Sequence, residues 1–386
     1  MPSRTHPARP IRRALILFLV TITVSGLMFA VAEYWVRQTQ PHDDLLAVTG
    51  QKKTQSWMQA WAQVDAFSAY RGRTGTYVDG VKTVNRYGFI STPDLPVTRD
   101  DPNTLRIVFL GGSSTAGTGG AWGGDLPDRE TWPWQVAEAL RAKLPGRKVE
   151  FINAGLSGYS SFESYGRLWS RIRFFKPDIV VVYHAWNEMY YFNKGDDIVN
   201  WRTLPDGSWG FHEEQTRKLY EPLWIDAWIH RSQLLTKARL RLSSQQRGET
   251  AESKPLSDHF NPAALDVFRD NMRLIASATQ LMGAELFVVK QATLVAADLP
   301  IEWQARCRYD FHGFDHRAHV DAFAQVFKIL DEEFPADHII DLTNLSGNPE
   351  YFFDHVHPNT IGARKIASGV ARGLLIYLAN RGKQAN

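Results

Sequence analysis

The stretch Leu105-Arg-Ile-Val-Phe-Leu-Gly-Gly-Ser-Ser-Thr115 joins a short β-branched run to a loop rich in glycine and serine. A short apolar run that ends at glycines predicts a buried strand, Leu105–Leu110, followed by a tight turn. The loop carries two adjacent hydroxyls, Ser113 and Ser114, directly after that strand. Whether it binds a phosphate, presents a nucleophile or only turns the chain depends on the segments around it.

Runs of the same kind recur along the chain and alternate with helical patterns. Further strands are predicted at Lys148–Ile152, Asp178–Tyr183, Glu285–Lys290 and His338–Leu342. Helices are predicted at Thr131–Leu144, Ser161–Phe175, Pro262–Met282, His316–Phe334 and Thr360–Asn380. This alternation indicates an α/β fold with a parallel, doubly wound sheet that helices cover on both faces. In such folds the functional site lies at the carboxyl ends of the strands.

The N-terminus has the features of a membrane helix or an export signal. Three arginines within residues 9–13 precede the uncharged stretch Ala14–Ala32, which as a helix is about 28 Å long and close to the thickness of a bilayer core. Positive charge before this stretch places the N-terminus in the cytoplasm and the rest of the chain outside. We expect a retained anchor. The alternative, a signal peptide cleaved near Ala30-Val31-Ala32, exports residues 33–386 as a secreted protein.

The sequence therefore divides into three parts. Residues 1–35 are a cytoplasmic tip and transmembrane anchor, and residues 36–104 are a lead segment with a helical patch expected at Ser56–Phe67. Residues 105–386 form the domain of alternating strands and helices, and an insertion at about 190–262 interrupts this alternation.

The insertion combines aromatic and basic residues. It includes a basic helical stretch, Lys237–Arg241, and a polar linker, Ser243–Asp258. Its four tryptophans are Trp201, Trp209, Trp224 and Trp228. Packing of these rings against the sheet is the expected role, and a stacking platform for sugar rings is the alternative. For the basic stretch a solvated helix face is expected, with anionic headgroups as the alternative partner.

Composition excludes some function classes. The chain has 386 residues, with 44 Lys and Arg against 41 Asp and Glu, so its net charge of +3 is too small to indicate a nucleic-acid partner. The single cysteine, Cys307, excludes an intrachain disulfide and any cysteine-based metal cluster.

Two familiar motifs do not account for the glycine-serine loop. Gly112–Gly117 has the glycine spacing of a phosphate-binding P-loop, but Thr118 occupies the position where that motif needs lysine. The nucleophile elbow Gly-x-Ser-x-Gly fails because Thr115 replaces its last glycine. A serine nucleophile therefore needs support from other segments.

Three segments elsewhere in the chain can supply that support. Asp354-His355-Val356-His357 places a carboxylate three residues before an imidazole, so that Asp354 can orient His357 as a base for a serine. Gly158 follows the second predicted strand and Asn187 follows the third. Both can stabilise an oxyanion, through a backbone N–H and a side-chain amide. The alternatives are plain turns and caps.

Taken together, these segments resemble the four blocks of the SGNH, or GDSL-type, esterases and lipases. Gly111-Gly-Ser113-Ser-Thr115 is similar to the first block and makes Ser113 the nucleophile. Gly158 and Asn187 match the oxyanion residues of the second and third blocks, and Asp354 with His357 matches the last. The resemblance runs over about residues 105–378. It implies a flavodoxin-like three-layer α/β/α sandwich around a five-stranded parallel sheet.

The sequence departs from the family pattern at two places. Gly112 replaces the aspartate of Gly-Asp-Ser, and Ala185 and Glu188 replace the glycine and aspartate of Gly-x-Asn-Asp. Neither change removes a group that takes part in the chemistry. The lead segment Asn85-Arg-Tyr-Gly88-Phe is also similar to what precedes the first block in exported bacterial members.

The resemblance implies a serine esterase that acts on O-acyl esters, with Ser113, His357 and Asp354 as the triad and Ser113, Gly158 and Asn187 as the oxyanion hole. It requires no metal and no cofactor. The expected partners are an acylated extracytoplasmic glycan or lipid as substrate and a membrane through the N-terminal helix. An O-acyltransferase that uses the same serine and a catalytically silent assembly subunit remain as alternatives.

Three histidines in the C-terminal part also resemble a metal-ligand pattern. His316 and His319 share a helix face, and His312 lies just before them. A cluster of surface histidines is the expected role, and a metal site is the alternative.

Overall fold

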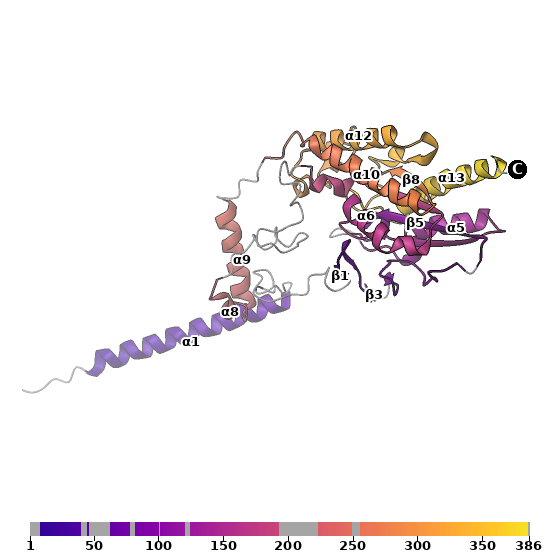
Figure 1. Ribbon diagram of the computed structural model, residues 1–386. Coiled ribbons are helices and arrows are strands. Elements are labelled where there is room, and N and C mark those ends of the chain that lie inside the picture. Colours follow the sequence, from indigo (N-terminus) through magenta and orange to yellow (C-terminus); the bar gives the residue numbers. More distant parts are fainter. Residues whose placement is uncertain are drawn as a thin grey trace, which may run out of the picture. The chain divides into compact units, whose positions relative to one another are not determined.

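The computed structural model describes residues 8–39, 45, 62–77, 82–99, 101–119, 124–192, 223–248 and 255–384 (Figure 1). The chain forms two compact units. One comprises Gln55–Trp201 and Pro255–Asn386, and the other comprises Met1–Thr54 and Arg202–Lys254. Residues 223–248 of the insertion therefore belong with the N-terminal segment, whereas the described residues of the lead segment from Ala62 onward belong to the larger unit.

The larger unit is built on a five-stranded parallel sheet, as predicted. Its strands are β5 (Thr104–Gly111), β6 (Lys148–Asn153), β7 (Ile179–Tyr183), β8 (Glu285–Lys290) and β9 (Ile339–Asp341). They are ordered β6-β5-β7-β8-β9. This is the flavodoxin-like order, in which the first strand lies between the second and the third. Every residue of β5 and β7 is buried, as expected for central strands that are covered on both faces.

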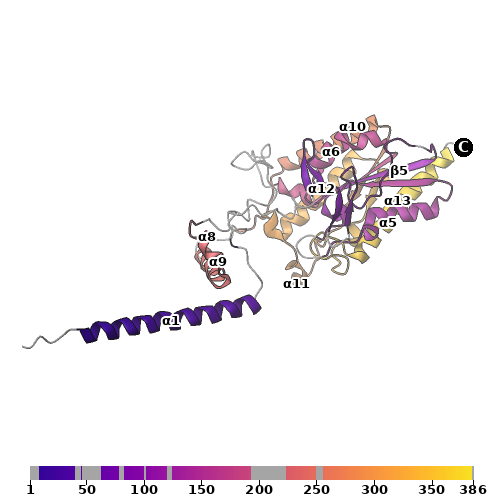
Figure 2. The ribbon, with the colours of Figure 1, turned by 90° about the horizontal axis from the view of Figure 1, so that it is seen from below.

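Helices cover both faces and complete the three layers (Figures 1 and 2). On one face α5 (Trp132–Lys143) packs against α13 (Thr360–Gln384). On the other, α10 (Ala263–Leu281) packs against both α6 (Ser161–Ser170) and α12 (His316–Glu333). The predicted helix Ser161–Phe175 is shorter than expected, because α6 ends at Ser170 and a 3₁₀ turn, Ile172–Phe175, follows it.

The lead segment contributes two antiparallel hairpins instead of a helix. They consist of β1 (Ala62–Asp65) with β2 (Ala69–Gly72), and β3 (Gly75–Tyr77) with β4 (Lys82–Val84). The helical prediction for Ser56–Phe67 is thus wrong where the structure describes it, and residues 56–61 lie outside the described part. The reason is local: the Asp65 carboxylate accepts the N–H groups of Phe67 and Ser68 at 3.1 Å and reverses the chain.

The smaller unit contains the N-terminal helix α1 (Ala8–Thr39). Between Arg13 and Thr39 this helix is long and apolar enough to cross a membrane, a property that signal sequences share. The same unit contains α8 (Asp226–Ile229) and α9 (Gln233–Gly248). The helical prediction for Lys237–Arg241 is confirmed, whereas the linker predicted from Ser243 begins later, because α9 continues to Gly248.

Two of the four insertion tryptophans can be located. Trp224 and Trp228 are 84% and 64% exposed and belong to the unit of α1. The expectation that they pack against the sheet is therefore wrong. Trp201 and Trp209 lie outside the described residues.

Candidate active site

The polar residues predicted from the sequence gather at the switch point of the sheet. Ser113 follows β5, and Asn187 lies just beyond β7, which is paired in parallel with β5 up to Gly111 and Tyr183. After β5 the chain forms β6 on one side of β5, and it then crosses to form β7 on the other side of β5. The loops after β5 and β7 therefore diverge and leave room for a ligand between them.

A continuous chain of hydrogen bonds joins Ser113, His357 and Asp354. Ser113 Oγ and His357 Nε2 are 2.7 Å apart, and His357 Nδ1 and Asp354 Oδ2 are also 2.7 Å apart. Ser113 stands 244 positions away from His357 in the sequence, so only the fold brings them together. The histidine is oriented by a carboxylate on one ring nitrogen and faces a hydroxyl with the other, which is the arrangement of a nucleophile with its base.

Asp354 is held as an anion in a buried position. Its other oxygen, Oδ1, accepts the backbone N–H groups of Val356 and His357 at 2.9 Å. Burial alone raises the pKa of this carboxyl. The hydrogen bond and charge of His357, with smaller contributions from His355 and Val356, outweigh burial and hold the pKa well below its usual range. Asp354 therefore stays charged and fixes the imidazole in one orientation.

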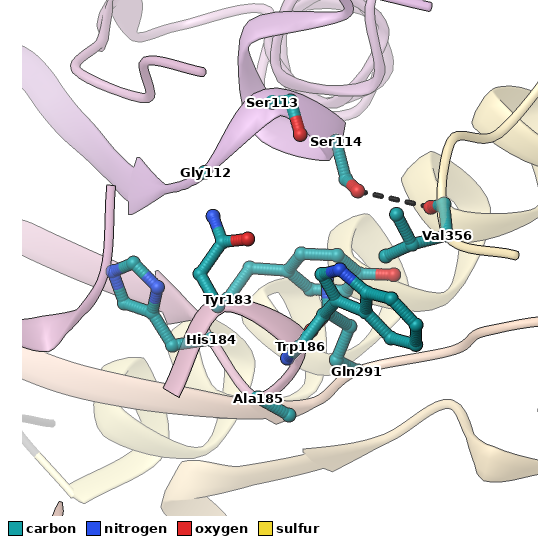
Figure 3. Close-up of a pocket in the computed structure, with 10 residues that line it drawn as sticks. Gly112, Ser113, Ser114, Tyr183, His184, Ala185, Trp186, Gln291 and Val356 are labelled. Atoms are coloured by element: carbon teal, nitrogen blue, oxygen red, sulfur yellow. Dashed lines mark hydrogen bonds between the residues drawn. The ribbon is translucent and has the colours of Figure 1, made fainter. Parts of the chain in front are cut away.

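The two adjacent serines have different partners. Ser114 is buried, and its hydroxyl donates to the backbone carbonyl of Val356 at 2.9 Å (Figure 3). This bond ties the loop after β5 to the loop that carries His357. Ser113, by contrast, directs its hydroxyl to the imidazole. The hydroxyl of Ser113, and not that of Ser114, is therefore the one that faces the base, and its role as nucleophile stays a prediction.

Asn187 lies beside Gly112, and the missing side chain of Gly112 makes room for it. A Cβ at position 112 would come under 3.0 Å from Asn187 Nδ2 and 3.2 Å from the Tyr159 carbonyl oxygen. Asn187 Nδ2 donates to that carbonyl at 2.8 Å, which fixes the amide. An amide nitrogen carries two hydrogens, so the second is available to a bound group.

Gly158 lies next to Tyr159, on the loop after β6. Its φ of 77° is in the left-handed region that favours glycine. The carbonyl that fixes Asn187 therefore directly follows Gly158 along the chain. The direction of the Gly158 N–H toward an oxyanion stays a prediction.

Behind Asn187, a buried polar network holds the 3₁₀ segment Trp186–Tyr190 against α6. Glu188 is fully buried and accepts Ser161 N at 2.8 Å, Ser161 Oγ at 2.7 Å and Tyr191 Oη at 2.6 Å. Burial raises the pKa of Glu188 to about 7, although the hydrogen bonds from Tyr191 and Ser161 lower it. His184 Nδ1 is 3.6 Å from the same carboxylate. Glu188 thus anchors the segment that carries Asn187.

The lead segment supports the nucleophile loop from outside the sheet. Lys82 of β4 is 2% exposed and donates from Nζ to the Ala116 carbonyl at 2.9 Å. Burial lowers the pKa of Lys82 to about 8. Tyr70 of β2 donates from Oη to the carbonyl of Ser157, on the loop that also carries Gly158. No sequence pattern indicated these contacts, because they depend on hairpins that the residue pattern did not predict.

The histidine pattern at residues 312–319 is a buried aromatic cluster. His312 and His319 are 2% and 0% exposed, so the prediction of a surface cluster is wrong for both. They lie against Trp186, with ring centroids at 4.6 and 5.4 Å, and His355 stacks on the same indole at 4.2 Å. His316 instead forms a hydrogen bond between Nδ1 and the Tyr309 hydroxyl, at 2.6 Å. Among the described residues, no group of three or more His, Cys, Asp or Glu side chains could hold a metal ion.

A small cavity opens between these elements (Figure 3). It leaves about 10 Å³ for the centre of a water-sized sphere, which is enough for roughly one water molecule. Its lining comes from the ends of β5, β7 and β8 and from the loop of His357: Gly112, Ser113, Ser114, Tyr183, His184, Ala185, Trp186, Asn187, Gln291 and Val356. Ser113 and Asn187 thus face one space.

Comparisons with known proteins find likenesses in structure and none in sequence. No protein-family model matches the chain, and no curated protein matches it. Among solved structures it is similar to an α/β hydrolase from the metagenome of Lake Arreo, Spain, with 13% identity over 70% of this chain and 94% of that chain and a TM-score of 0.39. It is also similar to an acetylxylan esterase from Geobacillus stearothermophilus, with 14% identity over 70% of this chain and 93% of that chain and a TM-score of 0.38. Likenesses at this level carry no conclusion about activity, which has to be argued from the residues themselves.

Proposed function

We propose that this protein is a serine esterase of the SGNH type that hydrolyses O-acyl esters. One observation carries the proposal: Ser113, His357 and Asp354 form an unbroken hydrogen-bonded chain at the switch point of the sheet, with 2.7 Å at each step. Asp354 is only three residues before His357, whereas Ser113 is 244 positions away from His357 in the sequence. Their alignment supplies a nucleophile, a base and an orienting carboxylate, which is what acyl transfer through a serine needs.

The chemistry follows from the two ring nitrogens of His357. Ser113 Oγ attacks the ester carbonyl while its proton moves to Nε2, and the resulting imidazolium is stabilised by Asp354 at Nδ1. The tetrahedral intermediate then expels the alcohol, which takes the proton from Nε2. Water repeats the sequence on the acyl-serine: it gives its proton to His357, attacks the carbonyl and releases the acid, and Ser113 regains the proton.

The oxyanion is proposed to lie between Asn187 and the backbone N–H groups of Ser113 and Gly158. Support comes from Asn187, which lines the same cavity as Ser113 and whose amide is fixed by the Tyr159 carbonyl. Fixed donors of this kind contribute about 3–4 kcal/mol each to the transition state, because they need not reorganise as charge develops.

The substrate is proposed to be an acetyl or other short-acyl ester of an extracytoplasmic glycan or lipid. Anchoring by α1, with the catalytic unit outside the cytoplasm, follows from the arginines before the apolar stretch and from the length of the helix.

The test is hydrolysis of p-nitrophenyl acetate by the full-length protein in detergent. Activity that disappears in Ser113→Ala and persists in Ser114→Ala supports the proposal. Equal activity in the wild type and in Ser113→Ala contradicts it.

A second candidate, an O-acyltransferase, uses the same acyl-serine and differs only in the group that receives the acyl chain. Its specific support is the exported position proposed for the domain, where acceptor glycans occur. Product analysis with an acetylated glycan separates the two activities. Free acetate, unchanged by an added acceptor sugar, indicates the hydrolase, and acetylated acceptor indicates the transferase.

A further inference from the structure

Part of the insertion is built around the C-terminal end of α1. The carboxylate of Glu33 accepts hydrogen bonds from Ser232 Oγ at 2.7 Å and from the backbone N–H groups of Gln233 and Leu234 at 2.9 Å. These groups open α9. Glu33 therefore caps a helix that begins about 200 residues further along the chain, and its negative charge lies at the positive end of that helix's dipole.

The contact with Glu33 sets where α9 begins relative to the membrane and in which direction it runs. Glu33 is the first charged residue after the apolar stretch Ala14–Ala32, so in an anchored protein it lies where α1 leaves the hydrocarbon core. Figure 1 shows α9 crossing α1 steeply instead of running alongside it, with the start of α9 against α1. A helix that begins at this level and crosses the spanning helix runs along the membrane surface.

In residues 223–242 several polar side chains are buried and several large apolar side chains are exposed, the reverse of what is favourable in water. Three polar side chains, Asp226, Gln233 and Thr236, are at most 2% exposed, whereas Trp224 and Trp228 are 84% and 64% exposed. Four further apolar side chains are exposed, namely Leu223, Ile225, Leu235 and Leu242. Such a surface is expected where apolar side chains meet lipid, and tryptophan in particular is enriched at the boundary between bilayer and water.

The net positive charge of residues 223–248 also suits a membrane surface. Residues 223–248 contain a single acid, Asp226, which pairs with Arg239 at 3.1 Å. Against it stand five bases: Arg231, Lys237, Arg239, Arg241 and Arg247. Of these, Arg231 and Arg241 are exposed. A basic, tryptophan-bearing helix at this level complements the anionic headgroups of a bilayer.

We propose that residues 223–242 form a membrane-surface platform, held in place by Glu33, that binds anionic phospholipid headgroups on the extracytoplasmic face. The inference rests on α1 spanning the membrane, as proposed above, and does not depend on the esterase activity. Because the platform belongs to an insertion, the catalytic unit is joined to the membrane unit by three chain connections, near residues 54, 201 and 254.

The experiment measures the depth of a nitroxide in the full-length protein reconstituted into nanodiscs that contain phosphatidylglycerol. The label is attached at Trp228→Cys in a Cys307→Ser background, and at Leu242→Cys as a second position. Collisions with oxygen, which concentrates in lipid, are compared with collisions with a water-soluble nickel chelate. The matched control is Leu281→Cys at the end of α10, where the side chain is 87% exposed in the catalytic unit.

The platform predicts that labels at 228 and 242 collide more with oxygen and less with nickel than the control label. Labels at both positions that meet nickel as often as the control overturn the proposal and leave a protein partner as the alternative. In Glu33→Ala the nickel collisions at 228 are expected to rise toward the control, with no change after Glu138→Ala on the surface of α5. An unchanged label in Glu33→Ala overturns the capping role.

Discussion

Replacement of Gly112 by alanine tests the link between the nucleophile loop and Asn187. The φ of Gly112 is −87°, which any residue can adopt, so the substitution introduces a contact without backbone strain. The new Cβ would lie under 3.0 Å from Asn187 Nδ2. To reach ordinary contact the amide must retreat by about 1 Å. A shift of that size takes it out of hydrogen-bond reach of an oxyanion, whose donors have to lie within a few tenths of an ångström.

The expected cost is that of one oxyanion donor, about 100- to 1,000-fold in kcat or roughly 3–4 kcal/mol. The assay is hydrolysis of p-nitrophenyl acetate, with Gly146→Ala as the matched control because a Cβ there meets nothing within 4 Å. If Gly112→Ala acts through the amide, it adds little to Asn187→Ala in a double-mutant cycle. Unchanged kcat in Gly112→Ala, or full additivity with Asn187→Ala, would show that Gly112 does not act through the amide of Asn187.

Three further predictions concern the groups around the triad. Asp354→Asn is expected to lower kcat about 10⁴-fold in the same assay, because the imidazole loses its orienting anion, and a loss below tenfold would contradict this role. Burial raises the pKa of Glu188 from 4.5 to about 7, so the stability that its protonated form contributes is lost as pH rises from 4.5 through 7. The free energy of unfolding should fall by up to about 1.4 kcal/mol per pH unit in that range. Glu188→Gln should remove this pH dependence in melting curves recorded from pH 4.5 to 8. Burial lowers the pKa of His355 from 6.5 to about 3, so stability that is present above pH 6.5 is lost as pH falls toward 3. His355→Phe keeps a ring on Trp186, and its melting temperature should depend less on pH between 6.5 and 3 than that of the wild type. An unchanged pH dependence would count against this role of His355.

The sheet could be predicted, and the candidate site residues could be singled out, because their signals are local. The strand Glu285–Lys290 has the predicted ends, since a short β-branched run between polar residues marks a buried strand on its own. Ser113, Asn187, Asp354 and His357 each follow a predicted strand or precede a predicted helix. Parallel topology then brings the carboxyl ends of the strands together without further information.

One prediction failed for a local reason: residues near Ala62 have helical propensity, but the turn at Asp65 lets them pair with Ala69–Gly72 as a strand. The other failures depend on contacts between distant segments. His319 has the spacing of a surface residue beside His316, and only the packing of Trp186 shows that it is buried. The role of Glu33 is of the same kind, because its partners lie about 200 residues away.

These measurements need the full-length protein, because a soluble fragment without α1 would leave part of the insertion without its contacts. A fragment that begins near residue 42 lacks α1 and therefore leaves α9 without the Glu33 carboxylate and without the surface of Val36, which is 7% exposed. The exposed apolar side chains of α8 and α9 would then remain on a soluble protein, which favours aggregation. Full-length protein in detergent or nanodiscs avoids this problem.

Covalent trapping identifies the nucleophile, which we propose to be Ser113. The full-length protein is treated with a fluorophosphonate, digested, and mapped by mass spectrometry. One adduct is expected, on Ser113, formed equally in Ser114→Ala and absent in Ser113→Ala and His357→Ala. An adduct on Ser114 or on another residue, with esterase activity that survives Ser113→Ala, would contradict it.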